Sequence, residues 1–288
     1  MGQSGSGLAD GWQKWITAAE AGVLRLLAGD HEADESGFDP EFNANVFMPL
    51  FRPLYRSWFR VRMRGIEHLP ACGPALVVAN HSGVLPFDAL MLQAGIFDEH
   101  PQHRNLRVLS ADLVYEVPVL SELARRSGHI RAGREQAEEV LAAGHLVGVF
   151  PEGFKGIGKP FRERYRLQRF GRGGFASTAR QAGVPIVPCA IVGAEEIYPM
   201  IGNSRPVARL LRLPYFPVTP LFPWLGLIGA VPLPSNWVIE FCPPVPTDGA
   251  STSGMDADQA VCFLADRVRD IIQLKLDQLI AERGPAFS

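Results

Sequence analysis

Short apolar runs that end at Gly, Pro or polar residues recur along the chain. Leu76 to Ala79 and Val147 to Phe150 have the length of buried strands, and Val184 to Val192 and Trp237 to Cys242 form two more such runs. After the first run, Phe87 to Ile96 repeats apolar residues at helical intervals. Strands of this kind separated by helical patterns are typical of α/β proteins, so the pattern predicts an α/β fold.

Further helical patterns lie on both sides of these strands. Residues 10–28 predict a short helix, 134–143 a helix before the second apolar run, and 256–282 a long amphipathic helix. An acidic linker at 29–39 and a polar linker at 247–255 separate the outer helices from the rest. We therefore expect three parts: a helical, membrane-facing segment at 1–64, a central domain at 65–246, and a C-terminal linker with its helix at 247–288.

Two apolar segments have more than one interpretation. Residues 46–64 predict a helix with aromatic residues on one face and arginines between them, which can pack on the sheet or lie on anionic lipid. Residues 210–237 are apolar but rich in proline, which prevents a regular helix. This second segment is either an irregular, well-packed connection or an apolar flap beside an acyl chain or a bilayer surface.

Composition and charge describe an apolar chain whose middle part is basic. The chain of 288 residues is 47% apolar, and its mean hydropathy of +0.05 is high for a freely soluble protein. Net charge is −2, but residues 1–50 carry two cations against eight acids (−6), 51–214 carry 22 against 14 (+8), and the remainder four against eight (−4). The sequence contains no run of about 20 apolar residues, so it predicts no membrane-spanning helix.

The cysteines and the N-terminal residues indicate a compartment. The four cysteines are widely spaced and form no metal-ligand pattern, which favours buried free thiols in a reducing environment and no metal site. Residues 1–10 lack the basic and apolar regions of a signal peptide. We therefore expect a cytoplasmic protein.

The connection after the first apolar run carries the candidate chemistry. His81 follows the strand, and Asp88 opens the next helix. An imidazole has a reference pKa of about 6.5 and serves as a general base when a neighbouring carboxylate fixes its tautomer. The alternative is that His81 and Asp88 only cap the strand and the helix.

Four sequence blocks, taken together in this order, resemble the glycerolipid acyltransferases. The family's first block, N-H-x4-D, is matched by Asn80 and His81, with Asp88 two residues later than in the pattern. The second block, a Gly followed six residues later by an Arg, is matched by Gly128 and Arg134. The third, F-P-E-G-T-R, and the fourth, V-P-I-V-P, are matched by Phe150 to Gly153, with Phe154 and Lys155 in place of Thr-Arg, and by Val184 to Pro188.

The resemblance covers residues 65–246 and implies a fold and a reaction. It implies a mixed, largely parallel central sheet flanked by helices, with N- and C-terminal helical additions, and it makes 65–246 an acyltransferase domain. It implies transfer of a fatty acyl group from acyl-CoA or an acyl carrier protein to a hydroxyl of a glycerolipid, with no cofactor beyond that co-substrate. The changes at Phe154 and Lys155 and the long insert at 156–174 look more like the diacylglycerol-acyltransferase-like branch than the lysophosphatidate branch. The protein would work at the inner face of the membrane and bind no nucleic acid.

The resemblance also assigns roles. His81 would be the general base and Asp88 its orienting partner. Ser82 and Gly83, or groups near Gly153, would supply backbone N–H groups to the oxyanion. The other substrate-binding positions would be Asn80, Arg134, Glu152, Phe154 and Lys155. Lys155, Lys159 and five arginines at 162–172 can bind phosphate or form a solvated basic surface.

Two other classes of protein fit the same residues. A hydrolase would use His81 to activate water on a thioester or ester, although no G-x-S-x-G elbow occurs. A lipid-binding protein with a decayed site would keep the fold without turnover. Acyl-CoA with and without an alcohol acceptor separates the two enzymes, and His81→Ala separates both from a binding protein.

Overall fold

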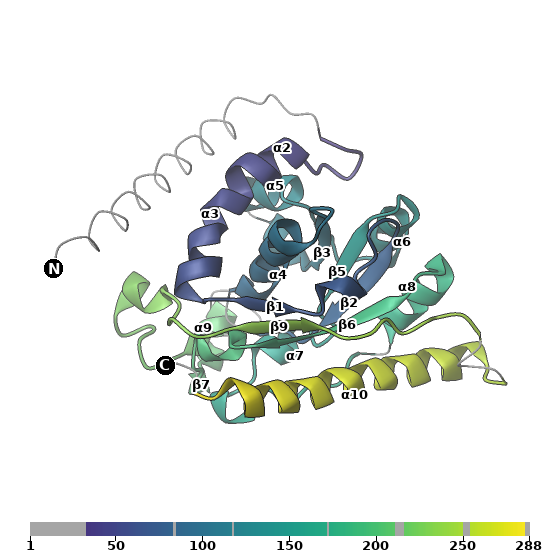
Figure 1. Cartoon of the computed structure of the whole chain (residues 1–288). Helices are drawn as coiled ribbons and strands as arrows, with labels where there is room; N and C mark the ends of the chain where they lie inside the picture. Colours follow the sequence, from purple (N-terminus) through teal and green to yellow (C-terminus); the bar gives the residue numbers. More distant parts are fainter. Residues whose placement is uncertain are drawn as a thin grey trace.

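The computed structural model describes residues 33–82, 85–116, 118–171, 173–210, 216–249 and 254–285. Two layers of helices enclose a seven-stranded sheet (Figure 1). The helix expected at 10–28 and the site residue Gly83 lie outside the described residues.

The sheet is mixed and largely parallel, as the resemblance implied. Its order is β1-β9-β6-β2-β5-β3-β4. β2, β3, β4, β5 and β6 run parallel, whereas β9 runs antiparallel to β6 and parallel to β1. The strands are β1 (Arg62–Arg64), β2 (Ala75–Ala79), β3 (Leu106–Ser110), β4 (His129–Arg131), β5 (Leu146–Val149), β6 (Ile186–Val192) and β9 (Val238–Phe241).

The strand residues alternate between two hydrophobic cores, one on each face of the sheet. In β2, Ala75, Val77 and Ala79 join one core, and Leu76 and Val78 join the other. Every residue of β2 and β6 is buried, which is expected of central strands covered on both faces. The fully apolar runs in the sequence are therefore the central strands.

Helices follow the strands and cover the two faces. α4 (Phe87–Glu99) lies on one face with the N-terminal helices, and α10 (Ala257–Arg283) runs along the other (Figure 1). The remaining helices are α5 (Pro118–Arg126), α6 (Arg134–Ala142), α7 (Phe154–Ile157), α8 (Gly174–Ala182) and α9 (Arg205–Leu210). Short 3₁₀ segments are η3 (Ile66–His68), η4 (Asp112–Tyr115), η5 (Phe161–Glu163), η6 (Ala194–Glu196) and η7 (Gly226–Ala230), and β7 (Gly202–Asn203) pairs with β8 (Pro217–Val218).

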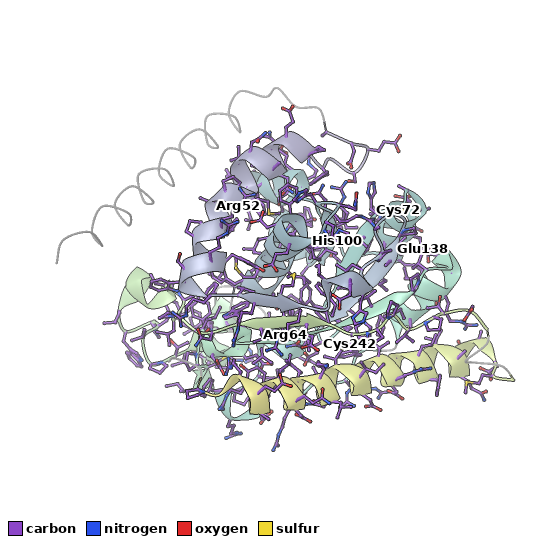
Figure 2. The ribbon with its side chains drawn as sticks, in the orientation of Figure 1. Arg52, Arg64, Cys72, His100, Glu138 and Cys242 are labelled. Carbon is purple, nitrogen blue, oxygen red and sulfur yellow. The ribbon has the colours of Figure 1, made fainter. Side chains whose placement is uncertain are left out.

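The N-terminal helix ends earlier than the sequence pattern predicts. It runs as α2 (Pro40–Phe42), the π-turn η1 (Asn43–Phe47), α3 (Met48–Pro53) and the π-turn η2 (Leu54–Trp58), and the arginine-rich stretch expected to continue it forms β1 instead. Its apolar side faces the core, and Arg52 pairs with Asp98 of α4 at 2.7 Å, while Arg64 lies at the sheet (Figure 2). Residues on both sides of position 64 thus share one core, and the three-part division stays a prediction.

The cysteines are free but not all buried. Cys189 and Cys242 are buried, whereas Cys72 and Cys262 are exposed, contrary to the expectation that all four are buried (Cys72 and Cys242 are labelled in Figure 2). Among the described residues, no cluster of three or more His, Cys, Asp or Glu side chains has the arrangement of a metal site. In the same part of the chain, no helix combines the length and apolarity needed to span a bilayer.

Candidate active site

The parallel strands β2, β3, β5 and β6 all end at the same edge of the sheet, which we call the catalytic edge. His81 lies just beyond β2, and Asp88 lies in the first turn of α4. His81 Nδ1 lies 2.6 Å from Asp88 Oδ2. The Asp88 side chain is fully buried, whereas the His81 ring is 17% exposed. The longer loop therefore still brings the two side chains together.

Backbone groups hold the Asp88 carboxylate in place. Oδ2 also accepts the N–H of Ser82 at 2.8 Å, and Oδ1 accepts the N–H of Ala89 at 2.8 Å. Because the carboxylate accepts a hydrogen bond from Nδ1–H, the imidazole is held in the tautomer with hydrogen on Nδ1, which leaves a lone pair on Nε2. Among the described residues, His81 Nε2 has no hydrogen-bond partner. The pair therefore presents a basic nitrogen at a partly exposed position.

Two of the expected oxyanion donors, the N–H groups of Ser82 and Gly153, are engaged elsewhere, and Gly83 lies outside the described residues. The N–H of Ser82 is bound to Asp88, and the N–H of Gly153 is bound to the carbonyl of Phe150 at 3.1 Å. The structure therefore does not support Ser82 and Gly153 as donors. Ser82 is itself buried, and within the described part of the chain its Oγ has no hydrogen-bond partner.

Asn80 extends the pairing of β2 with β6 by one residue. The last register pair of these strands is Ala79 with Cys189. Beyond it, Asn80 Nδ2 donates to the carbonyl of Ile191 at 3.0 Å, and Asn80 Oδ1 accepts the N–H of Ile191 at 2.7 Å. The buried side chain thus takes the place of one more backbone pairing between β2 and β6. It fixes the point where the His81 loop leaves the sheet.

Glu152 holds the backbone of His81 from the neighbouring strand. It follows β5, is buried, and accepts the N–H of His81 at 3.0 Å through Oε1. Its Oε2 accepts the N–H of Gln168 at 2.7 Å. A Cβ on Gly156 would lie 2.7 Å from Glu152 Cβ and 3.1 Å from the carbonyl oxygen of His81. Gly156 therefore allows α7 to pack directly against this loop.

Lys159 is buried beneath Glu152 instead of facing solvent with the other cations. Its Nζ lies 3.4 Å from Glu152 Oε2 and 3.0 Å from Glu195 Oε1, and it donates to the carbonyl of Arg166. Its side chain is 3% exposed. This placement is inconsistent with a phosphate-binding role for Lys159, because its ammonium group is already paired with two carboxylates.

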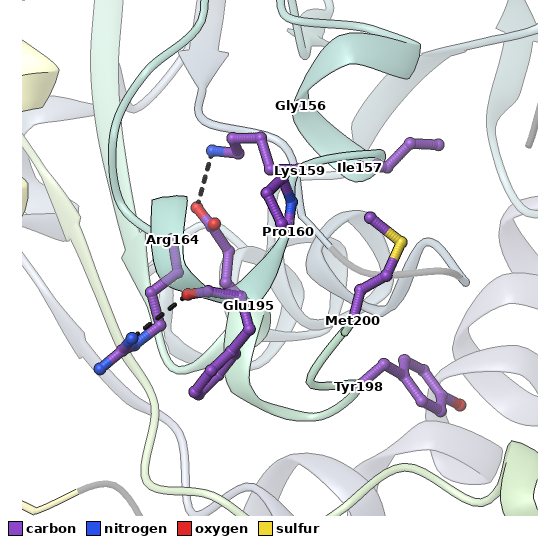
Figure 3. A pocket seen from close by; sticks show the side chains of 9 residues that line it. Gly156, Ile157, Lys159, Pro160, Arg164, Glu195, Tyr198 and Met200 are labelled. Carbon is purple, nitrogen blue, oxygen red and sulfur yellow. Dashed lines mark hydrogen bonds and ion pairs between the residues drawn. The ribbon is translucent and has the colours of Figure 1, made fainter. Parts of the chain in front are cut away.

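Glu195, whose side chain is 6% exposed, belongs to this cluster and is not indicated by the sequence pattern. Burial raises its pKa to about 7, and the positive charge of Lys159 opposes that rise. The available signal was position alone, since Glu195 follows the apolar β6 strand after only Gly193 and Ala194. Lys159 and Glu195 line a small, partly open pocket, with Ile157, Met200 and Tyr198 along its other side (Figure 3).

The remaining expected site residues lie on the connections at the catalytic edge and are exposed. Phe154 and Lys155 begin α7 after Glu152 and Gly153, and among the described residues Lys155 has no hydrogen bond or ion pair. Gly153 has a φ of +53°, which favours glycine. Arg134 begins α6 and donates to Ser177 Oγ of α8 at 3.0 Å, so this hydrogen bond does not involve the His81 loop.

The fold and this site define a class of enzyme. A model of the family described as Acyltransferase matches residues 60–192, from β1 to the end of β6. The crystal structure of the 1-acyl-sn-glycerophosphate (LPA) acyltransferase PlsC from Thermotoga maritima is similar in fold, with a TM-score of 0.52, 16% identity and 82% of each chain covered.

Several curated relatives match most of the chain. An uncharacterized protein of Mycobacterium tuberculosis is 53% identical over 273 residues, covering 94% of this chain and 76% of the relative, and one from Mycobacterium leprae is equally similar. The "DGAT1/2-independent enzyme synthesizing storage lipids" of Bos taurus is 28% identical over 77% of this chain and 60% of that protein. The chain belongs to the acyltransferase family and is an acyltransferase.

Proposed function

We propose that the protein transfers a fatty acyl group from a thioester to a hydroxyl of a glycerolipid, with His81 as general base. The observation that carries this proposal is the 2.6 Å contact between His81 Nδ1 and the buried Asp88 carboxylate, which leaves Nε2 as the proton acceptor. A base fixed in one tautomer beside a carboxylate is what deprotonation of an alcohol requires.

The proposed reaction proceeds without an acyl-enzyme. Nε2 takes the proton of the acceptor hydroxyl as its oxygen attacks the thioester carbonyl carbon. The tetrahedral intermediate collapses with cleavage of the C–S bond, and the imidazolium returns the proton to the leaving thiolate. The products are an ester and a free thiol, and Asp88 stabilises the imidazolium between the two proton transfers.

The donor would be acyl-CoA or an acyl carrier protein, and the exposed cations Lys155 and Arg134 would bind its phosphate or that of the acceptor. Phe154 is 48% exposed beside Lys155 and would contact an apolar part of the substrate. Similarity to an enzyme named for storage-lipid synthesis favours an acylglycerol acceptor, and a lysophospholipid is the alternative. We further propose that the enzyme acts at the cytoplasmic face of the membrane and needs no metal or cofactor.

The test is acyl transfer from labelled acyl-CoA to mono- and diacylglycerol and to lysophospholipids. We expect His81→Ala to lower kcat by roughly a hundredfold or more, the usual effect of losing a general base. Asp88→Asn should also lower kcat with little change in KM. His145→Ala, at the opposite edge of the sheet, is the matched control and should keep wild-type turnover.

The same assay separates the alternatives. Release of free fatty acid at an equal rate without acceptor would identify a hydrolase. Full transfer activity in His81→Ala would contradict the proposed base. Absence of turnover in the wild type, with lipid binding kept in His81→Ala, would indicate a lipid-binding protein.

A further inference from the structure

Exposed apolar side chains are concentrated at the catalytic edge. One group lies on residues 201–233, inserted between β6 and β9, which we call the insert lobe (described at 201–210 and 216–233). Its exposed large apolar residues are Trp224, Leu225, Ile201 and Val231, at 72%, 53%, 65% and 52% exposure. β6 ends and β9 begins at the catalytic edge, so the lobe projects from the edge that carries His81.

The tip of the insert lobe needs few hydrogen bonds from water. Residues 213–239 contain no Asp, Glu, Lys or Arg. Thr219 accepts the N–H of Phe222 at 2.8 Å through Oγ1 and donates its own N–H to the Phe222 carbonyl, and the N–H of Leu225 is bound to the carbonyl of Leu221. A backbone satisfied internally loses little when water is withdrawn, which suits contact with lipid.

The lobe is held in a fixed position relative to the site. Tyr198 donates its hydroxyl to the carbonyl of Ala230 at 2.6 Å, and Trp58 Nε1 donates to the carbonyl of Pro232 at 2.9 Å. Tyr198 also lines the pocket beside Lys159 and Glu195 (Figure 3). The C-terminal part of the lobe is therefore anchored by contacts with two other parts of the fold.

A second group of exposed apolar residues lies across the edge. Val119 and Leu120, in the first turn of α5, are 73% and 44% exposed, and Leu113 in η4 is 38% exposed. Both segments follow β3, two strands beyond β2 in the sheet order, whereas the lobe lies on the β6 and β9 side. The His81 loop, with Leu85 at 45% exposure, lies between the two groups.

The opposite edge of the sheet has few exposed apolar side chains among the described residues. Among the described residues of the connections there, Met255 alone is a large apolar side chain exposed above a third. Cations accompany the apolar groups on the side of α7 and the insert lobe: Lys155 and Arg209 are exposed, and Arg162, with a side chain 83% exposed, lies 3.6 Å from Glu163. On the other side, Asp112 beside Leu113 is 80% exposed and lies 3.7 Å from Arg131. An apolar surface bordered by positive charge is complementary to a bilayer with anionic headgroups.

We propose that the catalytic edge is the membrane-docking surface of this enzyme, with Trp224 and Leu225 on one side of His81 and Val119 and Leu120 on the other entering the headgroup region of an anionic bilayer. The inference rests on the proposed function in one respect, since it explains how a lipid acceptor reaches His81 from the bilayer. This surface includes Trp224 and Leu225 of the 210–237 segment, for which the sequence left bilayer contact open, and is separate from the N-terminal helix that was also considered for membrane contact.

The first test is co-sedimentation of the full chain with phosphatidylcholine vesicles containing phosphatidylglycerol. Trp224→Ser with Leu225→Ser, and separately Val119→Ser with Leu120→Ser, should each lower vesicle partitioning by roughly tenfold or more, because burial of one large apolar side chain is worth about that factor. Leu274→Ser on α10, which is 62% exposed in the wild type, is the matched control and should bind as the wild type does.

The outcomes separate docking from catalysis. The docking variants should lose transfer to acceptor in vesicles but keep transfer to acceptor dispersed in detergent, while His81→Ala should bind vesicles and lose both activities. Wild-type partitioning of both double variants, or an equal loss in Leu274→Ser, would overturn the docking surface and leave the proposed reaction intact. If one double variant fails to fold, as judged by its circular dichroism, the other still decides, since the two pairs lie on different elements.

Discussion

At the scale of single residues, Lys159 is the side chain on which the buried charges depend. It lies between Glu152, which holds the His81 backbone, and Glu195, 43 positions later in the chain. The Glu152 side chain is fully buried and the Glu195 side chain is 6% exposed, so each carboxylate relies on the ammonium group in place of water. The residue acts on the site through Glu152 and not through substrate.

Replacement of Lys159 should therefore be costly. We expect Lys159→Met to lower the free energy of unfolding by about 3–5 kcal/mol, the cost of leaving a buried charge without its partner. Denaturant unfolding measures this loss. The double variant Lys159→Met with Glu195→Gln should recover part of it, and an exposed-site control, Lys155→Met, should change little. Unchanged stability in Lys159→Met would contradict the role assigned to the cluster.

The sequence could not place Lys159 because exposed and buried cations look alike in a charge run. The run at 155–172 contains a single acid, Glu163, so its basic character suggested a surface. The two carboxylates that bury Lys159 come from the ends of β5 and β6, and only the fold brings them together. The pairing of His81 with Asp88 was predictable because the two residues lie only seven positions apart in the chain.

At the scale of elements, the sequence pattern correctly predicted the helices whose ends are set by contacts within a short stretch of the chain. α4 and α10 begin and end close to the expected positions, and α10 starts at a capping box formed by Asp256 and Gln259. The error at 46–64 has a non-local cause. Arg60 adopts a φ of +45°, which ends the helix, and Arg62–Arg64 then pair with Val238–Glu240, about 176 positions away. No periodicity within the segment indicates that partner.

The bridge made by Asn80 gives an element-scale prediction. Asn80→Asp removes the donor to the Ile191 carbonyl and places a carboxylate oxygen against it. We expect the free energy of unfolding to fall by about 1–3 kcal/mol, the cost of an unsatisfied buried polar group. Calorimetry should detect a lower Tm, with Gln102→Glu on an exposed loop as the matched control. An unchanged Tm would mean that the β2 to β6 ladder does not depend on this side chain.

At the scale of the whole molecule, α10 is capped locally at its start and tied at its end to the segment that follows β6. Its N-terminus carries the capping box, and Arg283 in its last turn pairs with Glu196 at 2.5 Å, directly after β6. Glu196 neighbours Glu195, so the segment after β6 connects α10, the buried Lys159 cluster and the insert lobe. The short segment after β6 therefore contributes both to the stability of the fold and to the geometry of the catalytic edge.

Two buried groups in different parts of the molecule give the fold opposite pH dependences. Burial lowers the pKa of His129 from 6.5 to about 4, so its contribution to stability is complete above pH 6.5 and is lost as pH falls through 4. Burial raises the pKa of Glu195 from 4.5 to about 7, so its contribution is complete below pH 4.5 and is lost as pH rises through 7. Stability should therefore decline on both the acid and the neutral side.

Glu195→Gln isolates the second of these effects, because glutamine stays neutral at every pH. Relative to wild type, the stability of this variant should rise between pH 4.5 and pH 8, by a total of about 3 kcal/mol for a pKa change of this size. Unfolding free energies at several pH values in this range measure the difference, and Glu67→Gln at an exposed position should show no such trend. A constant difference between Glu195→Gln and wild type would mean that Glu195 does not take up a proton in this range, and the neutral-side decline would then need another group.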